Sequence, residues 1–305
     1  MLSRSNPYFQ QVELLLSLMP LVGREICFAL KGGSAINLFV RDLPRLSVDL
    51  DLTFLPVQER AQSLAEIDAA LARIALEIAR TLAGVEIQHG AGRPGERTKL
   101  LVKRGGVGVK VETSPVLRGA VGPPAIGGVC PTIEAQFGYV ELPLLHLHDL
   151  YAGKLCAALD RQHPRDLFDV KLLLENEGVT DDLMQVFIVY LISGNRPLAE
   201  MLAPQFQPLE TVFETQFRGM TMQPVSVAAL EETRRALVQL IQERLTEAQR
   251  RFLLSFKQGE PEWSLLPLPG ASQLPAVQWK LVNIGRMSKA KHAVAVEKLK
   301  QVLYG

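Results

Sequence analysis

Two aspartates, separated by a single leucine, stand in a short apolar stretch of the chain, residues Leu46–Leu52. In a β-strand alternate side chains share a face, so Asp49 and Asp51 would lie on one side, together with Ser47. Two carboxylates held about 7 Å apart on a rigid strand repel one another. A divalent cation, Mg²⁺ or Mn²⁺, offsets that repulsion and prefers such hard oxygen ligands. The pair is therefore a candidate metal site.

The simpler interpretation is a solvated strand face on which Arg45 balances the two aspartates. Aspartate is disfavoured in strands, however, and two within three residues argue against an idle surface. We expect the strand to span Arg45–Phe54, with Pro44 before it.

A Gly-Gly-Ser turn precedes this strand in the chain. Gly32 and Gly33 follow the apolar run Ile26–Leu30, and Ser34 is the expected N-cap of a helix. Free backbone N–H groups at the start of a helix hold phosphates. The alternative is an ordinary strand-to-helix turn. A phosphate-holding turn followed by an Asp-x-Asp strand predicts a cleft for a triphosphate and metal ions.

The turn and the strand together resemble the signature of the DNA polymerase beta-like nucleotidyltransferase superfamily, in the order Gly33-Ser34 and then Asp49-x-Asp51. The resemblance implies a third carboxylate on a neighbouring strand. Glu112 is the best candidate, because alternation along Val107–Thr113 places it on the side away from the valines. The alternative for Glu112 is a surface residue paired with Lys110 or Arg104.

A second group of charged residues occupies positions 154–169. Lys154 and Arg161 are seven residues apart on one predicted helix, and Asp166 and Asp169 are three apart on the next, which Pro164 opens. Such a group can be a salt-bridge network between helices. In a transferase, Lys154 would neutralise phosphate charge, while the aspartates would act as a base for the acceptor hydroxyl or hold the lysine in place.

The sequence Lys-Leu-x-Ala from Lys154, followed by Arg-Asp-Leu-x-Asp from Arg165, resembles the AbiEii/AbiGii-type nucleotidyltransferase toxins. These are effectors of type IV toxin–antitoxin pairs and of abortive infection. The region from Phe252 to Trp279 is similar too, so the resemblance extends over most of the chain. It implies two lobes, magnesium, a nucleoside triphosphate donor, transfer to the 3′ end of tRNA or another RNA acceptor, and a cognate antitoxin encoded in the same operon.

The predicted site follows from these residues and the resemblance. The predicted catalytic residues are Asp49, Asp51, Lys154, Asp166 and Asp169. The predicted nucleotide-binding residues are Gly32, Gly33, Ser34, Arg45, Ser47 and Lys154. The predicted metal ligands are Asp49, Asp51 and Glu112. Two alternatives stay open: nucleotidyl transfer to a small molecule such as an antibiotic hydroxyl, and a nucleotide-binding protein without turnover that acts through a protein partner.

The order of the predicted elements indicates an α+β fold. The first half alternates strands and helices, with strands at 26–30, 45–54, 85–89, 98–103 and 107–113 and a long helix ending near 81. From about His146 the pattern is helical, with candidates at 148–160, 164–175, 181–192, 227–245 and 290–303. We therefore predict a nucleotidyltransferase domain at 1–145, with a mixed sheet flanked by helices, and a helical domain at 146–305 that completes the active-site cleft. The Gly- and Pro-rich segment 115–131 is the expected loop before this change.

Composition restricts the remaining possibilities. The chain has 305 residues and a formal net charge of +1, so attraction to nucleic acid would need a local patch. One such patch is predicted near the end of the chain, at Lys280, Arg286, Lys289, Lys291, Lys298 and Lys300. The three cysteines have no metal-binding spacing, no apolar run is long enough to span a membrane, and no leader is evident in Met1–Pro7. A cytoplasmic location is expected.

Overall fold

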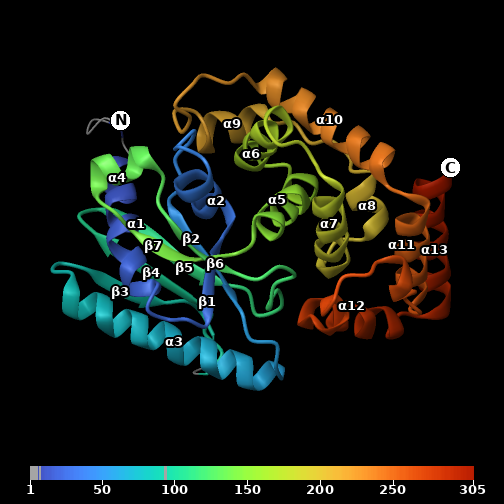
Figure 1. Ribbon diagram of the computed structural model, residues 1–305, viewed down its shortest axis with the longest axis horizontal. Coiled ribbons are helices and arrows are strands. Elements are labelled where there is room, and N and C mark those ends of the chain that lie inside the picture. The colour runs from blue at the N-terminus through green and yellow to red at the C-terminus, as the bar shows by residue number, and fades with distance from the viewer. Residues whose placement is uncertain (1–5, 7, 93–94) are drawn as a thin grey trace. The chain divides into compact units, whose positions relative to one another are not determined.

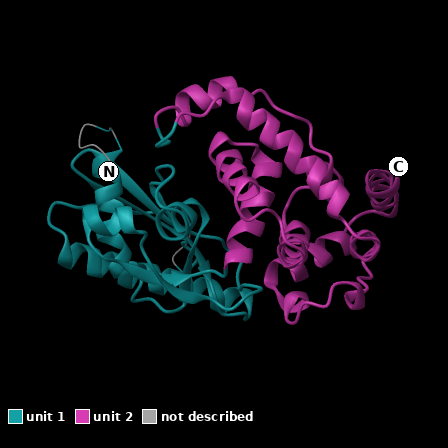
Figure 2. Ribbon diagram, turned by 45° about the horizontal axis from the view of Figure 1, so that its top comes forward, with its two compact units in different colours: residues 1–146, 220–223 teal, residues 147–219, 224–305 magenta. Residues whose placement is uncertain are grey.

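The computed structural model describes residue 6 and residues 8–92 and 95–305 (Figure 1). The prediction that Met1–Pro7 holds no leader falls largely on residues 1–5 and 7, which lie outside this described part. The chain divides into two compact units, residues 1–146 with 220–223 and residues 147–219 with 224–305 (Figure 2). The fold is of the α+β class, as predicted.

A mixed sheet forms the centre of the first unit, with the described strands in the order β3-β4-β5-β2-β1-β7-β6. The strands are β1 (Phe28–Lys31), β2 (Asp49–Phe54), β3 (Glu86–His89), β4 (Lys99–Arg104), β5 (Val107–Thr113), β6 (Ala125–Gly128) and β7 (Glu141–Leu144). β2 lies between β1, its antiparallel neighbour, and β5, its parallel neighbour. The predicted carboxylate strand is thus a central strand of the sheet.

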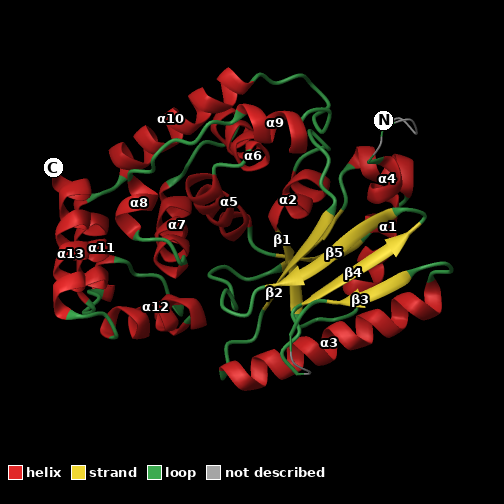
Figure 3. Ribbon diagram, turned by 180° about the vertical axis from the view of Figure 1, so that it is seen from behind, coloured by secondary structure: helices red, strands yellow, loops and turns green. Residues whose placement is uncertain are grey.

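Helices accompany this sheet: α1 (Phe9–Val22), α2 (Gly32–Ala35) continued by the π-helical turn η1 (Ile36–Val40), α3 (Arg60–Thr81) and α4 (Pro131–Phe137). α3 lies along the sheet (Figure 3). Its apolar residues, predicted from their three- and four-residue spacing, are all buried: Leu64, Ile67, Leu71, Ile74 and Ile78. The inward rows of the strands, such as Leu50 with Val111 and Leu100, are buried as well.

The sheet is larger than the sequence predicts. The segment 115–131 contains β6, and β7 follows it, so the predicted loop is partly wrong. The strand predicted at Arg45–Phe54 begins regular pairing only at Asp49; Arg45 forms an isolated bridge with Thr221 instead.

The second unit is helical. Its elements are α5 (Leu147–Arg161), α6 (Pro164–Glu175), α7 (Asp181–Ser193), α8 (Leu198–Leu202), α9 (Glu210–Gln216), α10 (Val227–Arg244), α11 (Glu247–Gln258), the 3-10 turns η2 (Trp263–Leu265) and η3 (Ala271–Gln273), α12 (Pro275–Gly285) and α13 (Lys289–Tyr304). The five predicted helices are present, and α8, α9, α11 and α12 are additions. In the described part of the chain, no helix has the length and apolarity needed to cross a membrane.

Candidate active site

The carboxylates of the proposed site in the first unit lie on one face of two adjacent strands, β2 and β5. Asp49 and Asp51 alternate with buried leucines on β2, as predicted. In the parallel register, Asp51 is the partner of Glu112 on β5, and Asp49 is the partner of Lys110. Register partners in neighbouring strands project to the same face of the sheet. The predicted third acid therefore stands beside the second.

Glu112 is engaged by lysines in this structure. Its carboxylate lies 3.4 Å from the ammonium of Lys99 on β4 and 3.4 Å from that of Lys110. These side chains are 35–41% exposed, so the pairs are worth little in water and can exchange partners. The sequence analysis gave pairing with Lys110 or Arg104 as the alternative role of Glu112. The structure shows the pair with Lys110, and its second partner is Lys99 in place of Arg104.

The glycine turn is shaped by its neighbours. Gly32 has a φ of +75°, and a Cβ built on it would lie 2.8 Å from Asp51 Oδ2. A Cβ on Gly33 would lie 2.7 Å from Arg45 Nη2 and 2.9 Å from Ser47 Oγ. Only glycine fits at both positions without displacing a neighbour. The turn therefore lies directly against the Asp-x-Asp strand and the residues before it.

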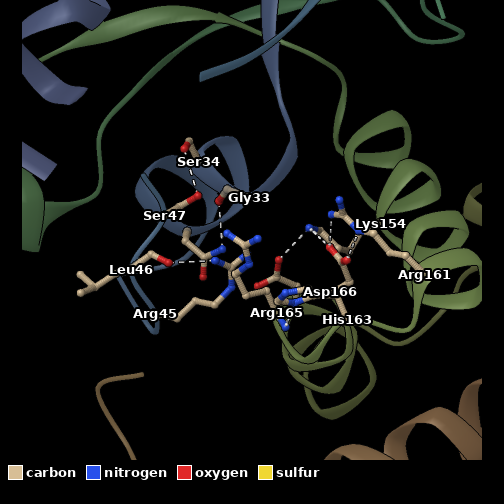
Figure 4. Close-up of polar contacts among 12 residues, drawn as sticks. Gly33, Ser34, Arg45, Leu46, Ser47, Lys154, Arg161, His163, Arg165 and Asp166 are labelled. Carbon is tan, nitrogen blue, oxygen red and sulfur yellow. Dashed lines mark hydrogen bonds and ion pairs between the residues drawn. The ribbon is translucent and has the colours of Figure 1, made fainter. Parts of the chain in front are cut away.

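Ser34 has a different role from the one predicted. The helix begins at Gly32 with Lys31 as its N-cap, so the N-cap assignment of Ser34 is wrong. Its side chain is buried, and its hydroxyl donates to the backbone oxygen of Asp49 at 2.5 Å and contacts Ser47 Oγ at 3.0 Å (Figure 4). Ser34 and Ser47 thus fix the turn to the start of β2, and Ser34 presents its hydroxyl to protein atoms.

Arg45 is only 2% exposed, and its guanidinium donates to the backbone oxygen of Leu46 at 2.8 Å (Figure 4). A distant segment, Met220–Gln223, holds this stretch in place. The backbone N–H of Leu46 donates to Met220, and that of Met222 donates to Pro44, at 2.8 and 2.9 Å. Sequence reasoning missed this pairing, because nothing in the local pattern of either segment points to the other.

The charged group of the second unit is a buried network. Lys154 Nζ lies 2.8 Å from Asp166 Oδ1 and 3.0 Å from Asp169 Oδ2, and all three side chains are at most 5% exposed (Figure 4). Arg161 donates to both oxygens of Asp166 at 2.6 and 3.0 Å. Both aspartates thus hold Lys154, which is one of the two roles predicted for them.

Electrostatic interactions within this network favour the ionised form of Asp166. Burial raises the pKa of Asp166, but the Lys154 ammonium and the Arg161 guanidinium outweigh that effect and hold the pKa well below its usual range. The start of α6 is fixed by His163, whose ring nitrogen accepts a hydrogen bond from the backbone N–H of Arg165 at 3.1 Å. Lys154 is therefore held in place in the second unit by two buried carboxylates.

The carboxylates of the first unit provide some, but not all, of the ligands that a divalent metal needs. Asp49 and Asp51 supply hard oxygens on one strand face, and Asp51 lies against the cradle formed by Gly32. Within the described residues, however, no three His, Cys, Asp or Glu side chains are grouped closely enough to enclose an ion. Glu112 would join such a site only by leaving its lysines.

Three residues of the predicted basic patch near the end of the chain contact other residues of the protein. Lys280 donates to the backbone oxygens of Gly194, Asn195 and Arg196, just after α7, so its inclusion in a free patch is wrong. Lys298 lies 3.5 Å from Glu200. Arg286 stacks over Trp279 at 5.5 Å from the ring centroid.

Comparison with known proteins shows which fold and which family this chain resembles. The fold is similar to the solved structure of MenT4, a nucleotidyltransferase toxin from Mycobacterium tuberculosis, with a TM-score of 0.60 and 18% identity over 99% of this chain and 96% of that one. Two Helicobacter pylori proteins are more distant: one has a TM-score of 0.47 and 19% identity over 80% of this chain and 97% of its own, and the other, JHP933, has 0.44 and 19% over 84% and 100%. No curated protein sequence matches the chain. Residues 13–283 match the family described as nucleotidyl transferase AbiEii toxin, type IV toxin–antitoxin system. The chain therefore belongs to the AbiEii family of type IV toxins and is a nucleotidyltransferase.

Proposed function

We propose that this enzyme transfers a nucleoside monophosphate from a nucleoside triphosphate to the 3′ end of tRNA and thereby inhibits growth. The observation that carries the proposal is the contact between the glycine turn and the carboxylate strand, where the Gly32 backbone lies against Asp51. In this arrangement the turn would bind the phosphates of a nucleotide, and the two aspartates would bind the metal ion that accompanies the same nucleotide.

In the proposed reaction, the 3′ hydroxyl of the acceptor attacks the α-phosphorus of the triphosphate. A new P–O bond forms, the bond to the β-phosphate oxygen breaks, and pyrophosphate leaves. Asp49 and Asp51 would hold Mg²⁺ or Mn²⁺, which would supply charge stabilisation for the transfer. Glu112 is the proposed third ligand. The attacking hydroxyl loses its proton to solvent or to a carboxylate of the site.

The protein's own contribution is positioning and charge. The backbone of Gly32 and Gly33 approaches the phosphates, and the buried Ser34 and Ser47 keep the turn fixed on β2. Arg45, held against Gly33, adds positive charge at the turn. Lys154, fixed by Asp166 and Asp169, is the proposed cation from the second unit. Preorganised charges of this kind account for most of the rate enhancement in phosphate transfer.

Incubation of the purified enzyme with labelled nucleoside triphosphates, total tRNA and magnesium tests this proposal. Label on tRNA that disappears in Asp49→Asn supports it. Label on a small-molecule acceptor would instead assign an antibiotic-modifying type of transfer. Binding of nucleotide without transfer to any acceptor would favour a protein that acts through a partner.

The type IV family membership also implies a cognate antitoxin, and we propose that its gene lies in the same operon. Expression of the enzyme alone should inhibit growth, and co-expression of the neighbouring gene should restore it. The Asp49→Asn variant should be harmless with or without that gene. Growth inhibition by Asp49→Asn would show that toxicity does not depend on transfer.

A further inference from the structure

One further charged residue belongs to the face that carries the carboxylates. Lys31 is the last residue of β1, and in the antiparallel register it is the partner of Asp51. Asp51 is in turn the partner of Glu112, and Glu112 is the partner of Lys99 on β4. Four charged residues therefore form a row across four strands in the order Lys31, Asp51, Glu112, Lys99.

The two lysines that end this row differ in their contacts. Lys99 and Lys110 both reach the carboxylate of Glu112. For Lys31, no carboxylate oxygen of the described residues lies within the 4.0 Å of an ion pair, although Asp51 and Glu112 influence its charge. Burial lowers the pKa of Lys31, and the two acids act in the opposite direction. Among the described residues, the Lys31 ammonium therefore has no ion pair to offset the cost of its desolvation.

The position of Lys31 also joins the two parts of the proposed nucleotide site. It immediately precedes Gly32, so its side chain starts at the turn, and its strand partner is the acid that lies against that turn. A lysine stem reaches about 6 Å from its Cα, far enough to place an ammonium beside a phosphate on the backbone of the turn.

We propose that Lys31 is a nucleotide-binding residue whose ammonium pairs with the triphosphate at the Gly32–Gly33 turn. This proposal rests on the proposed function. A nucleoside triphosphate carries more negative charge than one divalent cation neutralises, and a lysine at a glycine turn provides the remaining point charge.

A purely structural role makes the opposite prediction for stability. If Lys31 served the fold, replacing it would remove the positive charge beside Asp51 and lower the melting temperature. If Lys31 serves to bind a ligand, the desolvation of its ammonium lowers the stability of the ligand-free protein. Lys31→Met, which keeps the apolar stem and removes the charge, should then melt at the same temperature or higher.

The experiment compares Lys31→Met with Lys99→Met, the other lysine of the same row. Affinity for the α,β-methylene analogues of ATP, GTP, CTP and UTP is measured by calorimetry with magnesium present. For the analogue that the wild type binds best, Lys31→Met should weaken binding at least tenfold, and Lys31→Arg should restore most of it. Lys99→Met should stay within about threefold, since Lys99 is already paired with Glu112.

A second measurement separates the contribution of the phosphate chain to binding from that of the nucleoside. Binding of the corresponding nucleoside monophosphate should change less than threefold in Lys31→Met. Unchanged triphosphate affinity in that variant, or a melting temperature that falls while affinity is preserved, would overturn the role of Lys31 and leave the proposed function intact. Failure of the wild type to bind any of the four analogues would overturn both.

Discussion

Lys154 on α5 and Asp166 on α6 form an ion pair of 2.8 Å in which neither side chain is more than 5% exposed. Removal of one partner from a buried pair leaves an uncompensated charge. We expect Asp166→Asn to lower the free energy of unfolding by about 3 kcal/mol, since Asp169 still faces the lysine. Chemical denaturation measures this, with Lys171→Met, which breaks the more exposed pair with Glu175, as the control. Equal losses in both variants would contradict the buried-network assignment.

The same pair predicts a pH dependence. The pKa of Asp166 is lower in the folded than in the unfolded protein, so the folded state binds fewer protons. The stabilisation is therefore complete above the unfolded value of about 3.9 and is lost as the pH falls below it. The difference in unfolding free energy between the wild type and Asp166→Asn should be constant from pH 7 to about pH 5 and should shrink toward pH 3. A constant difference over the whole range would show that Asp166 is not held ionised.

Glu112 and Asp51 are register partners, yet they should differ as metal ligands. Manganese should raise the melting temperature of the wild type, and Asp51→Asn should abolish this rise and remove transfer, while the metal-free protein stays folded. Glu112→Gln should reduce transfer more than tenfold if Glu112 leaves Lys99 and Lys110 to join the ion. A smaller loss would mean that the third ligand lies elsewhere and that the lysine pairs are the whole role of Glu112.

Gly32 and Gly84 provide a matched pair for the turn. Both have positive φ, +75° and +70°, but a Cβ on Gly32 meets Asp51 and one on Gly84 meets nothing within 4 Å. Gly84→Ala should cost about 1 kcal/mol from backbone strain alone. Gly32→Ala should cost more and should also weaken metal binding by displacing the Asp51 carboxylate. Identical melting temperatures in the two variants would argue against the close contact.

The lysines near the end of the chain should separate into two kinds. Lys289 and Lys291 are exposed, so their replacement by Glu should raise the KM for RNA and flatten its salt dependence without affecting stability. Lys280→Met should instead lower the melting temperature, because it removes three hydrogen bonds to backbone oxygens just after α7. RNA transfer that is unchanged across salt concentrations in the Lys289/Lys291 variant would exclude this surface from acceptor binding.

The elements that the sequence predicts best carry their own local signals. β5 spans Val107–Thr113, as predicted, because valines alternate with polar residues after the Gly105-Gly106 hairpin turn, where both glycines have positive φ. α6 spans Pro164–Glu175, as predicted, because proline fits the first helical turn. α11 was missed although Thr246 and Gln249 form a capping box, a signal that is present in the sequence.

Other features depend on contacts that no local pattern records. β6 has the sequence Ala-Ile-Gly-Gly, and only its pairing with β7 makes it a strand. Ser34 has the residue type of an N-cap, but the helix begins three residues earlier than this would imply, at Gly32, and the Ser34 hydroxyl donates to the backbone oxygen of Asp49. The sequence predicts site residues from their types and spacing, but Lys31 is not among them, because only the pairing of β1 with β2 places it beside Asp51. Their partners, above all the lysines beside Glu112, depend on strand register.

The segment Met220–Gln223 makes the first unit discontinuous in the sequence. During synthesis, residues 1–146 leave the ribosome well before this segment, so the stretch around Arg45 cannot acquire its backbone partners until much of the helical unit has also been made. A gene fragment that ends at His146 would encode the sheet without the segment Met220–Gln223. A chimera that joins residues 1–146 to the helical half of another protein would lack this segment as well. Truncated products of interrupted translation should accordingly lack a finished nucleotide site.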